Sequence, residues 1–169
     1  MSADARVRVP LVVLTALVVH LSVLSRLRVL GVMPDGMLLV AVAAGIAGGP
    51  GRGAVVGFLA GMTVDVFLST PLGLSALVFS LVGYGVGTAQ TGILRSAWWI
   101  PVATAFVASA AGEVLFAVAG AVVGEPHLVN VHLLLVALLV GVENAALAPL
   151  AVRIVGWAVA RPSSGAYVV

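Results

Sequence analysis

Glycine recurs at every fourth position from residue 45 to residue 61, and Asp65 takes the next place in the series. Positions four apart in an α-helix follow one slowly winding line along its surface. We call the last part of this line the glycine stripe; it consists of Gly53, Gly57, Gly61 and Asp65. The stripe has no side chain until the Asp65 carboxylate, which lies about 18 Å along the helix from Gly53. In water each interior glycine weakens a helix by about 1 kcal/mol, but in lipid small residues let two helices come into close contact. The series therefore favours a membrane helix packed closely against another helix.

The composition agrees with a lipid environment. Hydrophobic residues make up 62% of the 169 residues and charged ones only 8%, with a mean hydropathy of +1.26. Soluble domains carry about 25% charged residues, so the sequence predicts an all-α, polytopic integral membrane protein with one membrane domain over residues 1–169. The eight basic residues are all arginines and form no cluster interleaved with aromatics, which argues against nucleic acid binding. Cysteine is absent, which excludes disulfides and thiolate metal sites.

Short segments that contain Gly or Pro divide the chain into apolar stretches, most of them near the roughly 17–25 residues that cross a membrane. The predicted spans are residues 9–25, 35–49, 53–69, 72–90, 97–123 and 129–152. The second stretch is short, so five spans remain the alternative if it is only re-entrant. The first has no small-residue cleavage site after it, and we interpret it as an uncleaved helix rather than a signal peptide. The tail over residues 162–169 is expected to be disordered.

The arginines predict an orientation. Six spans place both termini on the same side of the membrane, and cytoplasmic segments carry an excess of basic residues. With both termini in the cytoplasm, only Arg26 and Arg28 lie outside. The arginines inside are Arg6, Arg8, Arg52, Arg95, Arg153 and Arg161. A count of five spans would scatter this bias, so the bias independently supports six.

Three acids lie inside the predicted spans: Asp65, Glu113 and Glu143. An acid at the centre of a membrane helix costs about 2.5–3.5 kcal/mol on insertion scales, so such residues are functional candidates. They are expected to face the bundle interior, to be paired, or to be protonated. Arg26 and Arg28, at the outer end of the first span, are hypothesised to reach Asp65 or Glu113. A structural hydrogen bond or ion pair is nevertheless favoured over a ligand or proton site.

A second pair of small residues four apart, Gly83 and Gly87, lies in the fourth predicted span. Such pairs also let helices approach closely. The sequence leaves open whether these glycines and the glycine stripe pack against a helix of the same chain or against a helix of a partner.

Enzyme and metal sites find little support in the sequence. Neither Gly-x-Ser-x-Gly nor His-Glu-x-x-His occurs, and these patterns are typical of serine hydrolases and zinc proteases. Glu125, His127 and His132 match metal ligands in type but not in spacing. His20 is interpreted as a packed core histidine. We therefore predict a non-catalytic protein with no cofactor and no metal.

Residues 34–87 resemble the rod shape-determining protein family MreD. The resemblance rests on the order and spacing of four motifs: Pro34-Asp35, then Gly53-x3-Gly57-Phe58-x2-Gly61-x3-Asp65, then Pro71-Leu72-Gly73, then Gly83-Tyr84-x2-Gly87. Over the rest of the chain only length and hydropathy agree.

The resemblance implies a non-catalytic subunit of the bacterial inner membrane that regulates cell shape and peptidoglycan synthesis by binding partner proteins. The implied partners are a single-span MreC-like protein, the wall synthases RodA and penicillin-binding protein 2, and the MreB cytoskeleton. It also implies a six-helix fold similar to the substrate-binding subunits of energy-coupling-factor vitamin transporters. Such a transporter subunit is the main alternative function, although aromatic residues are only 6% of the chain and ligand sites usually need them.

Overall fold

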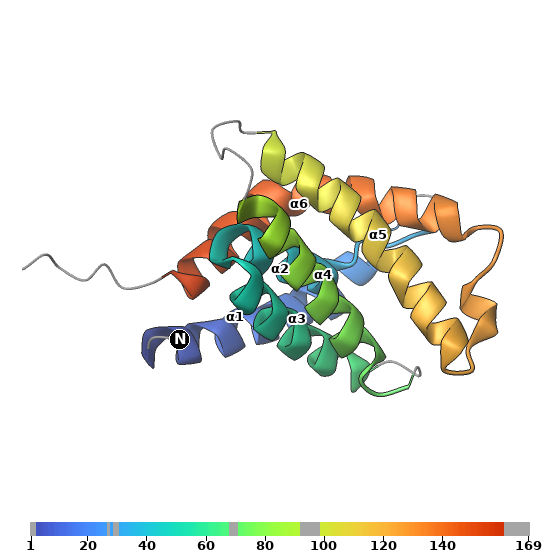
Figure 1. Cartoon of the computed structure of the whole chain (residues 1–169), viewed down its shortest axis with the longest axis horizontal. Coiled ribbons are helices and arrows are strands. Elements are labelled where there is room, and N and C mark those ends of the chain that lie inside the picture. The colour runs from blue at the N-terminus through green and yellow to red at the C-terminus, as the bar shows by residue number, and fades with distance from the viewer. Residues whose placement is uncertain (1–2, 27, 29–30, 68–70, 92–98, 161–169) are drawn as a thin grey trace, which may run out of the picture.

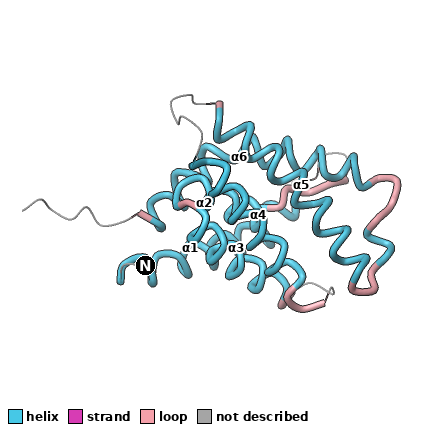
Figure 2. Tube along the Cα trace, in the orientation of Figure 1, coloured by secondary structure: helices cyan, strands magenta, loops and turns pink. Residues whose placement is uncertain are grey.

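The computed structural model describes residues 3–26, 28, 31–67, 71–91 and 99–160. Within these ranges the protein is all-α, and Figure 2 shows only helices and loops. The α-helices are α1 (Ala3–Ser22), α2 (Gly36–Gly48), α3 (Pro50–Asp65), α4 (Leu74–Thr91), α5 (Ile100–Val122) and α6 (Leu133–Val159). There are two short 3-10 turns: η1 (Leu24–Arg26) follows α1, and η2 (Pro126–Leu128) precedes α6. The predicted disordered tail over 162–169 lies outside the described residues, as do Arg95 and Arg161.

Each of the six predicted spans overlaps one of these helices, with shifted ends. The third helix begins at Pro50, three residues before the predicted span, because proline fits the first turn of a helix, where its missing N–H is not needed. Gly49, with φ of 80°, makes the turn between α2 and α3. The last helix continues to Val159, seven residues beyond the predicted end at 152. Pro149 lies inside it.

Helix α2 is the centre of the bundle (Figure 1), and every residue from Met37 to Ile46 is buried. A helix that is apolar all round is typical of such a buried position. Its 13 residues extend only about 20 Å, less than the roughly 30 Å hydrocarbon core of a bilayer. Because the other helices rather than lipid surround α2, the thickness of the bilayer does not set its length.

The outward faces of the bundle are apolar. Large exposed side chains occur on several helices and include Leu11, Leu14 and Val18 of α1, Phe58 of α3, Leu77 and Leu81 of α4, Val107 and Val118 of α5, and Leu134 and Val142 of α6. A soluble protein rarely exposes apolar surface on this scale. Three helical stretches are long and apolar enough to cross a membrane: Val7–Arg26, Ile100–Val122 and Leu133–Val159. Gly36–Gly48 and Leu74–Gln90 are shorter apolar helices, so the number of spans stays a prediction.

Candidate functional site

The glycine stripe faces α4, which lies beside α3 in the bundle (Figure 1). A Cβ atom added to Gly57 would overlap the carbonyl of Phe79, and one added to Gly61 would overlap the backbone of Ser75 and Ala76. A Cβ on Gly53 would overlap the carbonyl of Gly83. The two backbones are therefore in direct contact, as small residues permit in a membrane helix pair.

The second glycine pair belongs to the same interface. A Cβ on Gly83 would overlap the carbonyl of Gly53, and one on Gly87 would overlap Pro50 at the start of α3. Gly45 of α2 also approaches Gly83, because its added Cβ would lie 2.6 Å from the Gly83 carbonyl oxygen. The structure thus brings all five glycines of the two patterns together between α3 and α4. These glycines therefore pack against a helix of the same chain rather than against a partner.

Asp65, the last member of the stripe, lies at the first turn of α4. Its side chain is 1% exposed. One carboxylate oxygen, Oδ2, accepts hydrogen bonds from the N–H groups of Gly73 (2.9 Å) and Ala76 (3.2 Å), and Oδ1 accepts from the N–H of Ser75 (3.1 Å). The first N–H groups of a helix have no partner within it, and their positive dipole end favours an anion. Asp65 therefore caps α4 from the end of α3.

The sequence reasoning missed this cap. The sequence feature that could have predicted the cap is the short segment between Asp65 and Gly73-Leu74. A new apolar helix begins there, and its first backbone N–H groups need acceptors. The hypothesised ion pairs of Arg26 and Arg28 with Asp65 or Glu113 do not form among the described residues. Arg28 Nε instead lies 3.5 Å from the carbonyl oxygen of Ser25.

Hydrogen bonds between buried polar residues, which the sequence did not predict, connect α2, α5 and α6. Asn144 of α6 is fully buried, and its Nδ2 donates to the carbonyl oxygen of Asp35 and to Oγ of Ser109 on α5, both at 3.0 Å. Asp35 Oδ1 in turn accepts from the N–H groups of Met37 (3.0 Å) and Leu38 (2.9 Å) and so caps α2. Buried polar contacts of this kind fix how helices pack.

The other two acids have different surroundings from those of Asp65. Glu113 of α5 lines a cavity of about 340 Å³ together with Asp35, His20 and Ser75. Glu143 is on α6 beside Asn144 and does not line this cavity. The three acids predicted as candidates therefore occupy three different environments. Among the described residues, no group of three His, Asp or Glu side chains is arranged to hold a metal ion.

Arginine side chains gather where α1 and α3 begin and α6 ends. Arg52 Nη1 donates to the carbonyl oxygen of Val159 at 2.7 Å, close to the last turn of α6. The guanidinium of Arg8 lies 4.8 Å from the centre of the Trp157 ring, within the range of a cation–π contact. This arginine end of the bundle is the end away from Asp65.

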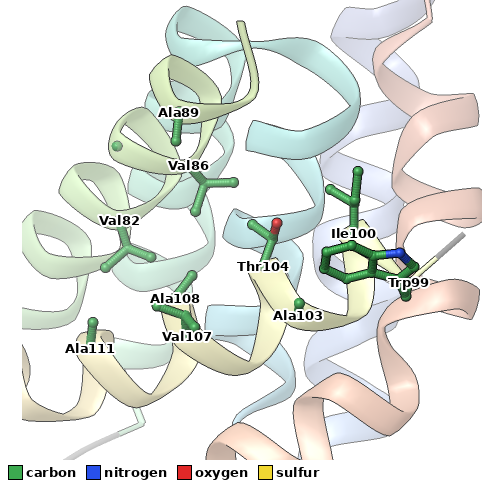
Figure 3. A pocket seen from close by; sticks show the side chains of 11 residues that line it. Val82, Val86, Ala89, Trp99, Ile100, Ala103, Thr104, Val107, Ala108 and Ala111 are labelled. Atoms are coloured by element: carbon green, nitrogen blue, oxygen red, sulfur yellow. The ribbon is translucent and has the colours of Figure 1, made fainter. Parts of the chain in front are cut away.

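A groove of about 540 Å³ runs between α4 and α5 on the outer surface. Figure 3 shows the side chains of both helices around it, with Val82, Val86 and Ala89 on α4 and Ala103, Val107 and Ala111 on α5. Gly85 also lines it, and a Cβ added there would meet nothing within 4 Å. The groove is almost wholly apolar.

An all-α bundle with apolar outer faces and buried polar contacts defines a helical membrane protein. Comparison with known families is more specific: the family described as rod shape-determining protein MreD matches residues 5–124. This match covers more than half of the chain, and the chain belongs to the MreD family. It also extends well beyond residues 34–87, on which the resemblance in the sequence rested. Membership implies a role in rod-shape determination, and MreD proteins are non-catalytic membrane proteins of the shape machinery.

No curated protein and no solved structure matches the chain. The expected similarity to the substrate-binding subunits of energy-coupling-factor transporters therefore stays a prediction.

Proposed function

We propose that this chain is a membrane adaptor that regulates peptidoglycan synthesis during cell elongation by binding partner membrane proteins. The proposed partners are a single-span MreC-like protein, wall synthases of the RodA and penicillin-binding protein 2 type, and through them an MreB-type cytoskeleton. Membership of the MreD family carries this proposal. The close α3–α4 contact supports it because backbones packed this tightly form a rigid unit.

The groove between α4 and α5 is the proposed contact for a partner transmembrane helix. Its small residues, Gly85, Ala89 and Ala103, are exposed, and small residues are enriched where membrane helices associate. The glycine stripe cannot serve this purpose, because α4 already covers it. The groove therefore takes the place of the stripe as the candidate partner interface.

The test replaces Ala103 by Leu, which fills the groove from α5 without touching the α3–α4 contact. Ala146→Leu is the matched control, because Ala146 is an exposed alanine on α6 that lines no described cavity. Each variant is co-expressed with a tagged single-span MreC-like partner, and the amount of chain recovered with the tag is measured. We expect Ala103→Leu to lower recovery by at least about fivefold, which corresponds to roughly 1 kcal/mol, and Ala146→Leu to leave it unchanged.

Equal recovery of both variants would contradict the groove as the interface. Failure of the unmodified chain to bind any of the proposed partners, together with a vitamin-like small molecule in the purified protein, would favour the transporter alternative instead. Gel filtration of each variant verifies that it remains folded.

We also propose that all six helices lie across the membrane with both termini in the cytoplasm. The arginine end, with Arg8 and Arg52, would then face the cytoplasm, as the excess of basic residues on that side requires. Alkaline phosphatase, which is active only outside the cytoplasm, is fused after Val159 and, separately, after His127. Activity is expected only from the second fusion, and activity from the first would overturn the orientation.

A further inference from the structure

The cavity of about 340 Å³ is lined by residues of all six α-helices and of the connection between α1 and α2. Most of its wall is apolar. Four polar side chains interrupt the wall: His20 of α1, Asp35 at the start of α2, Ser75 of α4 and Glu113 of α5. A mainly apolar pocket with a few convergent polar groups is the usual form of a small-molecule site, although this one is at the small end of the range.

Two of these polar groups have no hydrogen-bond partner in the described protein. They are Nδ1 of His20 and Oγ of Ser75, and the two residues are only 7% and 1% exposed. A buried polar atom without a partner costs about 1–3 kcal/mol, so native proteins rarely leave one unpaired. Both residues line the same cavity. Something within the cavity is therefore needed to complete their hydrogen bonds.

The charges of the cavity indicate what that occupant is. Asp35 and Glu113 bring two carboxyl groups to this mainly apolar cavity, and the His20 ring lines it as well. Arg26 and Arg28 form no ion pair with Glu113 among the described residues. Two carboxyl groups in a place of low dielectric constant stay charged together only when a cation lies beside them. Among the described residues no group of three His, Asp or Glu side chains is close enough together to hold a bare metal ion, so a larger cation suits the cavity better.

We infer that this cavity binds a small organic cation, a protonated amine carried on an apolar body. The three N–H donors of the ammonium group would go to the Glu113 carboxyl group, to the Asp35 carboxyl group, and to either the Ser75 hydroxyl or the His20 ring nitrogen. The apolar body would contact Phe79, Phe116 and the other apolar wall residues. This site is independent of the α4–α5 groove and of the proposed partner binding.

Benzylammonium is the probe, and benzyl alcohol is its uncharged counterpart of nearly the same shape. The full chain is purified in detergent and unfolded by heat with increasing amounts of either compound. A compound that binds only the folded protein raises the unfolding temperature in proportion to the logarithm of its concentration once the site is saturated. We expect benzylammonium to raise the unfolding temperature and benzyl alcohol to raise it much less.

Two variants test the assignment to this cavity. Glu113→Gln removes one charge at nearly constant shape and should weaken benzylammonium at least tenfold, whereas Glu125→Gln, a matched change at an acid outside the cavity, should not. Val136→Phe should abolish binding by filling the cavity without a change of charge, and it keeps the test decisive if Glu113→Gln fails to fold. Equal responses to the two compounds, or full binding by Val136→Phe, would mean that the cavity holds only water or nonspecific apolar molecules and would overturn the inference.

Discussion

At the scale of single residues, Asp65 shows how a buried acid in a membrane helix can be structural. The sequence placed it as an acid inside a predicted span, for which a structural hydrogen bond or ion pair was the favoured interpretation. The structure gives its carboxylate three backbone donors from Gly73, Ser75 and Ala76. These donors satisfy both oxygens of the side chain and so offset part of the cost of burying it.

We predict that Asp65→Ala destabilises the protein by roughly 3 kcal/mol, because it leaves these backbone N–H groups without an acceptor in a buried place. Asp65→Asn should cost less than half as much, since its one amide oxygen can still accept from the helix N-terminus. Unfolding in detergent by increasing mole fractions of sodium dodecyl sulfate measures both. If Asn proves as damaging as Ala, then the charge of Asp65, rather than its capping geometry, is what the fold requires.

At the scale of helices, the contact between α3 and α4 depends on glycine at each point where the backbones meet. Gly57 faces the Phe79 carbonyl and Gly61 faces the first turn of α4. Because the opposing atoms are backbone rather than flexible side chains, they cannot move aside without moving a whole helix. This explains why a stretch with poor helix propensity in water is suitable here.

We expect Gly57→Ala to destabilise the protein by about 2 kcal/mol or more, because even one methyl group forces α3 and α4 apart. Gly85→Ala is the control on α4, where an added Cβ meets nothing within 4 Å. It should be neutral or stabilising by up to about 1 kcal/mol, the gain in helix propensity. The same detergent unfolding measures both, and a neutral Gly57→Ala would show that the contact is looser than the structure indicates.

At the scale of the whole molecule, α2 organises the bundle. It is buried along almost its whole length, and Asn144 ties its first turn to α5 and α6 through Asp35 and Ser109. The last turn of α6 is held to the start of α3 by Arg52. The second half of the chain, which carried no recognisable motif in the sequence, is therefore bonded to the first half at both ends of α2.

Asn144→Ala is predicted to cost about 1–3 kcal/mol, because the buried Ser109 hydroxyl loses the Asn144 donor and the Asp35 carbonyl keeps only the N–H of Leu39. Asn130→Ala is the matched control, since Asn130 is exposed in the loop before α6 and its side chain bonds to the nearby backbone of His127 and His132. Thermal unfolding followed by gel filtration compares the two variants. Equal effects would show that the buried bonds of Asn144 do not hold the three helices together.

The sequence alone determined the lipid environment, the all-α class, the overlap of each predicted span with one helix, and the MreD family. These conclusions depend on properties that lie along the chain: apolar segments, Gly and Pro between them, and the four-residue glycine spacing. Helix ends were less accurate, as at Pro50 and Val159, because hydropathy does not record where the backbone donors of a helix stop.

Only the tertiary structure decided which surfaces meet. Helical spacing places Gly53, Gly57 and Gly61 on one line but cannot say whether α4 or a partner covers that line, and the structure shows α4. Helical spacing likewise does not show that His20, Ser75 and Glu113 line one cavity. These residues belong to three different helices, and their separation along the chain does not determine their distance in space. Contacts between helices depend on how all of them pack around α2, and this arrangement is a property of the whole molecule rather than of any segment.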